Sequence, residues 1–190
     1  MQEEERMYTL EELNKYVCVC RKCELSKERT QAVFGQGDPK AQIMFIGEGP
    51  GYHEDKQGLA FVGPAGQLLT DAIRSIGMKR EEVYIANVVK CRPPGNRNPL
   101  KEEMEACIQY LRYQVKIIQP HIIVCLGAIA ATNVIDKDFK ISKERGQWIL
   151  KKGIWIMPTF HPAAVLRDKN KEKSFFEDFM RIKEKMVSIE

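Results

Sequence analysis

Short apolar runs alternate along this chain with longer segments in which apolar and charged residues are mixed. The runs at residues 42–46, 83–89 and 122–127 contain no charged residue, and two tryptophans lie in a further apolar stretch around 147–157. Strands that are buried on both faces of a sheet have this length and composition. The pattern predicts a buried strand at each of the first three runs and further strands around 147–157.

Segments with helical periodicity lie between these runs. Thr9 and Glu12 have the spacing of a capping box, which predicts a short helix leading toward the first cysteines. Gly77 is a candidate C-cap for a helix at residues 67–76. Residues 18–40 and the proline-rich segment 93–99 lack periodicity and are expected to be irregular. Other helices are expected at 101–118, 128–134 and about 172–187.

Strands that alternate with helices predict an α/β fold. We expect a three-layer α/β/α arrangement on a mostly parallel, four-stranded sheet, because the strands are apolar throughout. The length of 190 residues suits one domain, and the sequence contains neither an internal repeat nor a linker. The expected parts are an N-terminal helix with a cysteine-containing segment (1–40), a core (41–167) and a C-terminal helix (168–190).

Composition and charge narrow the class of protein. The chain is 44% hydrophobic and 29% charged, which is ordinary for a soluble protein. No apolar stretch approaches the roughly 20 residues that cross a bilayer, and the acidic residues 1–5 do not resemble a secretory signal. We therefore expect a cytoplasmic monomer without a membrane partner. The net charge of +4 permits nucleic-acid binding but does not require it.

Two short loops, about 110 residues apart, each follow an expected strand. The first is Gly-Glu-Gly-Pro-Gly at residues 47–51, and the second is His-Pro-Ala-Ala-Val-Leu-Arg at residues 161–167. Loops at the carboxyl ends of strands in an open sheet can face each other across one crevice. The two loops therefore predict a shared site.

Four of the six cysteines have the spacing of a metal site: Cys20, Cys23, Cys91 and Cys107. A C-x2-C pair with two separated thiolates can close a four-cysteine site for zinc or for an iron–sulfur cluster, and spacing alone does not separate the two. Such a site would tie the N-terminal segment to the domain. Cys18 lies close enough to the pair to compete for the assignment, whereas Cys125 lies in an apolar strand and is interpreted as a core residue.

Several blocks follow one another in a distinctive order along the chain. They are Cys-x2-Cys at 20–23, Gly-Glu-Gly-Pro-Gly at 47–51, Phe-Val-Gly at 61–63, Asn-Val-Val-Lys-Cys-Arg-Pro-Pro at 87–94, Leu-Gly at 126–127 and the His-Pro loop at 161–167. Together they resemble the family 4 uracil-DNA glycosylases, which are iron–sulfur enzymes. The resemblance implies a [4Fe-4S] cluster on Cys20, Cys23, Cys91 and Cys107, and a uracil pocket between the two loops.

The implied reaction is hydrolysis of the N-glycosidic bond between uracil and deoxyribose in single- or double-stranded DNA, which releases uracil and leaves an abasic site for base excision repair. The base must first leave the stack. Phe61 would then stack on the flipped ring, and the amide of Asn87 would pair with uracil O4 and N3–H. His161 would donate a hydrogen bond to O2 as negative charge develops there.

The first loop departs from the usual pattern of the family. Gly49 replaces the usual alanine, and neither residue can act as a base, so Glu48 is the candidate that positions water. Gly47, Gly49 and Gly51 would bring backbone N–H groups close to the base and phosphate. Gly51 stands where other branches of the superfamily have a bulky aromatic residue, so Glu54 or another loop residue is expected to fill the space against the C5 methyl group of thymine.

The resemblance also suggests contacts with DNA. Basic side chains after the second strand and in the second loop would bind phosphates: Arg92, Arg97 and Arg167, with Lys90 nearby. Val165 or Leu166 would enter the gap that the flipped base leaves.

Two other classes of protein remain open at this level. One is a non-catalytic, metal-stabilised nucleic-acid-binding module with the same fold. The other is a zinc or redox protein that uses the cysteines directly. Release of free uracil separates the enzyme from the binding module, and brown colour separates an iron–sulfur protein from a zinc protein. The sequence does not identify a replication-clamp contact or any other protein partner.

Overall fold

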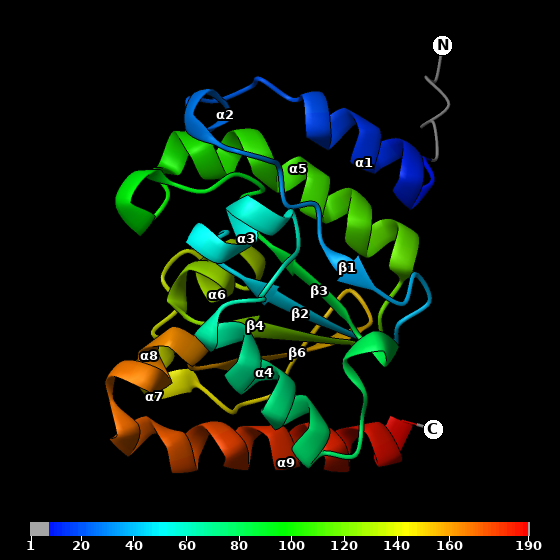
Figure 1. Cartoon of the computed structure of the whole chain (residues 1–190). Coiled ribbons are helices and arrows are strands. Elements are labelled where there is room, and N and C mark those ends of the chain that lie inside the picture. The colour runs from blue at the N-terminus through cyan, green and yellow to red at the C-terminus, as the bar shows by residue number, and fades with distance from the viewer. Residues whose placement is uncertain (1–7, 190) are drawn as a thin grey trace.

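The computed structural model describes residues 8–189 and consists of one sheet between two layers of helices (Figure 1). The strand order is β1-β3-β2-β4-β6-β5. The four inner strands are parallel: β2 (Ile43–Gly47), β3 (Tyr84–Asn87), β4 (Ile122–Leu126) and β6 (Ile154–Thr159). The edge strands β1 (Gln36–Gly37) and β5 (Ile149–Lys151) are antiparallel to their neighbours. The α/β/α fold on a mostly parallel sheet is confirmed, with six strands in place of four.

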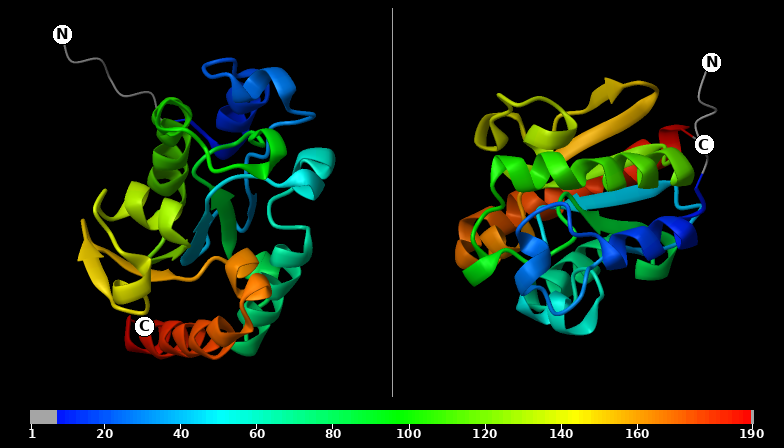
Figure 2. Two further views of the ribbon diagram at one scale, coloured as in Figure 1. Left: turned by 90° about the vertical axis from the view of Figure 1, so that its left-hand side faces the viewer. Right: turned by 90° about the horizontal axis from the view of Figure 1, so that it is seen from above.

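Longer helices cover the two faces of the sheet, as Figures 1 and 2 show. One face carries α1 (Leu10–Val19), α5 (Lys101–Ile118) and α6 (Ala128–Val134), and the other carries α4 (Pro64–Ser75), α8 (Pro162–Arg167) and α9 (Glu172–Ile189). The remaining elements are short: α2 (Leu25–Glu28), α3 (Tyr52–Gln57), η1 (Arg80–Glu82), η2 (Pro94–Asn96), α7 (Ile141–Glu144) and η3 (Lys169–Lys171). Among the described residues no helix is long and apolar enough to cross a membrane.

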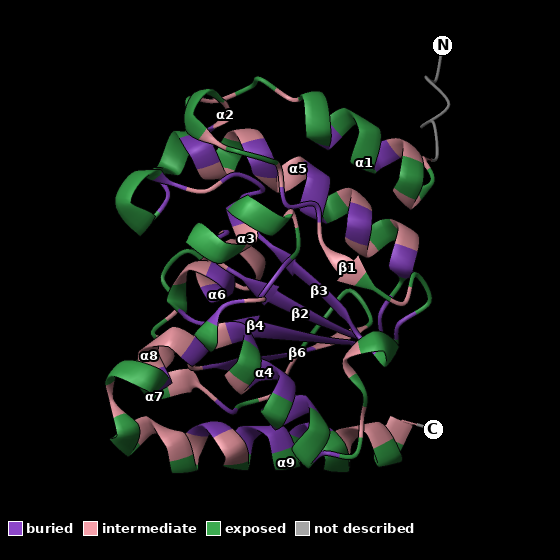
Figure 3. Cartoon of the chain, viewed as in Figure 1, coloured by how far each residue is buried: buried purple, intermediate pink, exposed green. Residues whose placement is uncertain are grey.

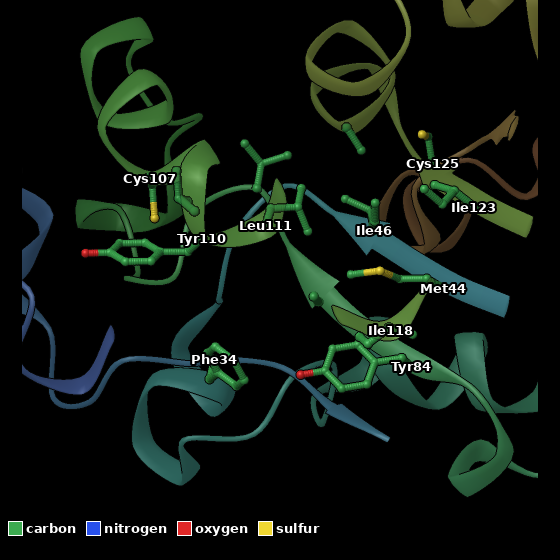
Figure 4. Packing of buried hydrophobic residues seen from close by; sticks show 14 of the residues in the cluster. Phe34, Met44, Ile46, Tyr84, Cys107, Tyr110, Leu111, Ile118, Ile123 and Cys125 are labelled. Atoms are coloured by element: carbon green, nitrogen blue, oxygen red, sulfur yellow. The ribbon is translucent and has the colours of Figure 1, made fainter. Parts of the chain in front are cut away.

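The strands are buried on both faces, which explains their continuous apolar sequence (Figure 3). In β2, Met44 and Ile46 pack into the cluster under α5, whereas Ile43 and Phe45 pack under α4 and α9. This alternation is the period of two expected of a strand. Figure 4 shows the first cluster, in which Leu111 of α5 lies among the side chains of the sheet.

Most of the expected helices are present where periodicity predicted them. Thr9 caps α1 in both directions, since its Oγ1 accepts the Glu12 N–H at 3.1 Å and its own N–H donates to the Glu12 carboxylate at 2.9 Å. Helices α5 and α6 have the predicted bounds, and α9 ends two residues later than predicted. Helix α4 ends at Ser75, and Gly77 follows with a left-handed φ of 86°.

Three short elements differ from the sequence-based expectation. Strand β1 lies within the segment that was predicted to be irregular, and it is too short to have a period. Helix α3 follows the glycine-rich loop and begins where Glu54 accepts the N–H of Gly51. The second loop is mostly helix α8, because Pro162 occupies the first helical turn and His161 caps it.

Candidate functional site

A cavity of about 320 Å³ lies at the carboxyl ends of the parallel strands, and both loops contribute to its wall. Glu48, Gly49 and Gly51 line it from the first loop, and His161 and Arg167 line it from the second. Phe61 and Asn87 also line it. The predicted shared site is therefore present, and its position is where ligands bind in open α/β sheets.

Gly47 allows two walls of the cavity to come together. It pairs with Asn87 in the register of β2 and β3. A Cβ atom at Gly47 would lie 2.5 Å from Asn87 Oδ1 and 2.5 Å from Cζ of Phe61. Real Cβ atoms do not approach other atoms so closely, so residue 47 must be glycine for both side chains to lie as they do.

Phe61 is held in a left-handed backbone conformation with φ of 53°. Two side chains hold the turn around it. Glu54 Oε1 accepts the N–H groups of Val62 and Gly63, both at 2.8 Å. On the other side of Phe61, Arg80 donates to the Ala60 carbonyl. The side chain is buried, and its ring centroid lies 5.6 Å from that of His161. The prediction that Phe61 belongs to the pocket is consistent with this position.

Asn87 is almost completely buried, with 1% of its surface exposed. Its Oδ1 is buried and has no hydrogen-bond partner. A buried acceptor without a partner costs roughly 1–3 kcal/mol. In a residue that lines a cavity, such an atom is suited to accept a hydrogen bond from a bound ligand.

His161 is the N-cap of α8, and its Nδ1 accepts the N–H of Ala163 at 3.1 Å. Because Nδ1 is an acceptor, the neutral ring carries its proton on Nε2, which is then a donor. Burial, together with the Arg167 guanidinium, lowers the pKa of His161 to about 4, against an opposing effect of Glu54. The imidazole is therefore neutral at physiological pH.

Gly127 packs directly behind this histidine. A Cβ atom there would lie 2.9 Å from the Cβ of His161, and the φ of Gly127 is 91°. Both the close approach and the backbone conformation require glycine. Leu126 is thus the last residue of β4, and Gly127 allows His161 to lie close to the backbone at this point.

Glu48 and Gly49 form the remaining part of the first loop that faces the cavity. Burial raises the pKa of Glu48, although Arg167 acts to lower it. A carboxyl group with a raised pKa in a cavity is a candidate for proton transfer or for positioning water. A Cβ atom at Gly49 would lie 2.7 Å from Cγ2 of Val89, so little room exists for a larger residue.

Glu54 lines the cavity, but its carboxylate is bound to the backbone. Oε2 accepts the Gly51 N–H at 3.1 Å, and Oε1 accepts the two N–H groups that follow Phe61. A Cβ atom on Gly51 would lie 2.8 Å from Oε2. Glu54 therefore joins the first loop to the turn of Phe61, and its action against a thymine methyl group stays a prediction.

The side chains predicted to contact DNA fall into two groups. Leu166 is 40% exposed, and Arg167 is exposed beside the cavity, so both are available to a ligand. Val165 is completely buried under α4 and α9, so the prediction that it could enter DNA is wrong. Lys90 is 1% exposed and cannot reach a phosphate either.

The two arginines of the loop after β3 already have partners within the protein. The guanidinium of Arg97 binds both carboxylate oxygens of Glu103, at 2.9 and 2.7 Å. Arg92 donates to Asn96 Oδ1 at 2.7 Å and lies over the ring of Tyr52, 5.2 Å from its centroid. Their phosphate contacts stay predictions, and the structure gives each of them a role in holding the loop.

The four predicted metal ligands line a second, small cavity near the N-terminal segment: Cys20, Cys23, Cys91 and Cys107. Three of the sulfurs accept hydrogen bonds, from Tyr110 Oη (3.2 Å to Cys20), Arg29 Nη1 (3.0 Å to Cys91) and the Lys90 N–H (3.3 Å to Cys107). Burial raises the pKa of Cys23 and Cys91, and that of Cys107 to about 12.

The structure separates these thiols from the other two. Cys18 is exposed and bonds to Asn14, and Cys125 is completely buried in β4, as predicted for a core residue. Within residues 8–189, no three His, Cys, Asp or Glu side chains are arranged to hold a single metal ion.

Comparison with known proteins agrees with the fold and the pocket. Residues 34–182 match the model of the Uracil DNA glycosylase superfamily, which is the class that this α/β fold and cavity define. The chain is 48% identical to the type-4 uracil-DNA glycosylase of Sulfurisphaera tokodaii, over 96% of this chain and 87% of that protein. It is 44% identical to the type-4 uracil-DNA glycosylase of Archaeoglobus fulgidus, over 94% of each chain. The protein belongs to the type-4 uracil-DNA glycosylases.

A more distant relative is of another type. The type-5 uracil-DNA glycosylase of Pyrobaculum aerophilum is 28% identical over 68% of this chain and 64% of its own length.

Several residues of the site had not been recognised in the sequence. Arg29 and Tyr110 donate to the thiols but are far from them along the chain, so no local pattern could reveal them. Gln114 lies in the middle of α5, and the periodic pattern of that helix does not distinguish it from the other polar positions. Lys90 did carry a signal, because it directly follows the uncharged run 83–89, and the structure buries it with that run.

Proposed function

We propose that this protein is a monofunctional uracil-DNA glycosylase with a [4Fe-4S] cluster. It flips uracil out of single- or double-stranded DNA, hydrolyses the N-glycosidic bond and leaves an abasic site for base excision repair. The observation that carries the proposal is the buried, unpartnered Oδ1 of Asn87 in a cavity that also contains the Nε2 donor of His161. The type-4 relatives support uracil as the substrate.

Recognition of the base rests on Asn87 and Phe61. Uracil N3–H would supply the donor that Oδ1 lacks, and the amide group of Asn87 would donate to O4. Cytosine has an acceptor at N3 and an amino group at position 4, so it would leave buried groups unpaired. Phe61 would stack on the ring, with Gly47 leaving room for both side chains.

Cleavage of the bond rests on His161. As the bond breaks, negative charge moves to uracil O2 and positive charge develops on the sugar. The neutral imidazole donates from Nε2 to O2, and Ala163 holds the ring in the required tautomer. A fixed donor of this kind is worth about 3–4 kcal/mol in the transition state.

Glu48 is the residue that we assign to the attacking water. It lines the cavity on the first loop, where Gly49 cannot act as a base. Burial raises the pKa of Glu48, and its ionised carboxylate, poorly solvated in the cavity, would accept a hydrogen bond from the attacking water. Among the described residues that line the cavity there is no lysine, which agrees with a hydrolase that does not form an imine with the sugar.

Contacts with the DNA backbone would centre on Arg167, which lines the cavity and is exposed. Leu166 would enter the gap in the stack, because it is exposed next to the cavity wall. Arg92 and Arg97 would add phosphate contacts at the edge of the loop after β3.

The second cavity supports the proposed cluster through the chemistry of its donors. Four cysteines converge on it, and the guanidinium of Arg29 donates to one sulfur. Because burial raises the thiol pKa values, a bound cationic centre is what would ionise these thiols. The cluster would be held by Cys20, Cys23, Cys91 and Cys107, and it would supply a covalent tie between the N-terminal segment, β3 and α5.

We also propose that the protein acts as a monomer in the cytoplasm. The exposed large apolar side chains are distributed over several elements of the described chain, including α1, α3, β5, α8 and α9, and such scattered residues are normal for a monomer.

The test is release of free uracil from matched U·G, U·A, T·G and single-stranded substrates. We expect release from the three uracil substrates and none from T·G. Asn87→Ala should slow release about 100-fold or more, whereas His121→Ala, at the opposite end of the sheet, should leave the rate unchanged. Binding of uracil-containing DNA without release would instead favour a non-catalytic binding module of the same fold.

A further inference from the structure

Lys90 is a buried cation whose contacts are all with uncharged groups. Its Nζ donates to the Asn87 carbonyl at 2.9 Å and to Gln114 Oε1 at 2.6 Å. Among the described residues no carboxylate forms an ion pair with it. Burying an ammonium group is costly unless charge of the opposite sign lies nearby. An ammonium group at this position would need a negative charge close by to be stable.

The first contact of Lys90 fixes a residue of the base pocket. The Asn87 carbonyl is at the last residue of β3, directly behind the side chain that we assign to uracil recognition. Gln114 anchors the ammonium from the opposite side, since its Nε2 donates to the Phe34 carbonyl at 2.9 Å and to Tyr84 Oη at 3.2 Å. Figure 4 shows Phe34 and Tyr84 in the same cluster beneath α5.

The other surroundings of Lys90 belong to the cysteine cavity. Lys90 lines that cavity, its own N–H donates to Cys107 Sγ at 3.3 Å, and Cys91 is the next residue in the chain. Four cysteine thiolates around an iron–sulfur cluster carry net negative charge. This charge would lie next to the buried ammonium, where the low local dielectric makes the attraction strong.

We propose that Lys90 is a positioning residue that couples the four-cysteine site to the base pocket. Its charge is balanced by the thiolates, and its hydrogen bond to the Asn87 carbonyl holds the recognition amide in place. The inference rests on the proposed cluster and goes beyond it, because it gives the cluster a role in the shape of the pocket as well as in the stability of the fold.

The test compares the iron-loaded wild type with Lys90→Met, which keeps the length of the side chain and removes its charge. Lys151→Met is the matched control, because Lys151 also donates to two carbonyls (3.1 and 2.7 Å) but is exposed and distant from both sites. The measurements are iron content, the single-turnover excision rate, the Kd for DNA and the reduction potential of the cluster.

For Lys90→Met we expect a single-turnover rate at least tenfold lower, with the Kd for DNA within about twofold of wild type, because a displaced Asn87 affects the chemical step more than backbone binding. The reduction potential should become more negative, since a positive charge near the cluster is lost. Lys151→Met should match the wild type in all measurements.

An unchanged rate or an unchanged potential in Lys90→Met would overturn the coupling. If that variant does not fold or lacks iron, Gln114→Met provides a second test of the coupling. It retains the charge and removes the anchor of the ammonium, so excision should fall while the potential stays at the wild-type value, and a wild-type rate would overturn the proposal. A wild type that releases no uracil, or contains no iron, would instead refute the proposed function itself.

Discussion

His161 illustrates how a single residue acquires its chemistry from its neighbours. The sequence places a histidine at the end of a strand, and the resemblance to the family 4 enzymes implies a donor there that faces the leaving base. The tautomer could not be predicted, because it depends on the Ala163 N–H and on the turn that begins α8. Burial then keeps the ring neutral.

A pH–rate profile tests this assignment. Because the pKa of His161 is lowered to about 4, excision should not decline as the pH falls through 6.5, the usual value for histidine. Because burial raises the pKa of Glu48, its carboxylate is lost as the pH falls toward this raised value, and excision should decline there. The acid limb of the single-turnover profile should disappear in Glu48→Gln.

His161→Ala is the companion measurement. We expect a rate lower by about 10²–10³-fold at every pH, with the shape of the profile unchanged, because only a neutral donor is lost. A limb centred near pH 6.5 that His161→Ala removes would show that the charged imidazole is the active form.

Lys90 shows where reasoning from residue type alone failed. Lys90 precedes the arginines of the loop after β3 and was interpreted as lying near phosphates, but it is buried in the segment that directly follows β3. Val165 failed for a similar reason. The second loop is a helix, so one side of it faces the core and the other faces outward.

At the scale of elements, helix α5 is fixed at its first turn by Glu103. The carboxylate accepts the Leu100 N–H at 2.7 Å and binds the guanidinium of Arg97, which lowers the pKa of Glu103. The period of the sequence predicts the bounds of α5, but it does not predict that Arg97, an expected phosphate contact, also pairs with Glu103, because an ion pair that forms only when the loop folds has no local pattern. The helix also carries Cys107 and Gln114, so its position matters to both cavities.

Arg97→Ala and Arg167→Ala should therefore have different effects. Arg97→Ala should lower the melting temperature at neutral pH, and the loss should disappear as the pH falls through the lowered pKa of Glu103, since the partner is then uncharged. Arg167→Ala should keep the melting temperature and weaken DNA binding, with a salt dependence of log Kd lower by about one unit of slope.

Salt titrations of DNA binding and thermal melts of both variants provide the comparison. Glu103→Ala serves as a control for Arg97, because the double variant should melt no lower than the less stable single variant. An unchanged melting temperature for Arg97→Ala would contradict the structural role of its pair with Glu103, whatever its effect on the salt slope.

At the scale of the whole molecule, the apolar runs predict a central sheet with helices on both faces. Strands that are apolar throughout are typical of parallel sheets that are covered on both sides. The edge strand β1 was not predicted, and β5 was placed only within the strands expected around 147–157, since two or three residues that are partly exposed have no distinctive period. The cysteine spacing predicted that the N-terminal segment joins the core, and the structure brings all four sulfurs to one cavity formed by that segment, the end of β3 and α5.

Removal of individual thiols tests whether a metal centre maintains this arrangement, and the chain supplies its own controls. Cys20→Ala should lower the iron content and the melting temperature together, because metal binding is coupled to folding. Cys18→Ala should change neither, since its exposed thiol donates to Asn14 Oδ1 and lies outside the cysteine cavity. Cys125→Ala should lower the melting temperature by a few degrees through its core cavity but retain iron. Iron retained in Cys20→Ala and lost in Cys18→Ala would move the ligand to Cys18 and reverse the assignment of the N-terminal pair.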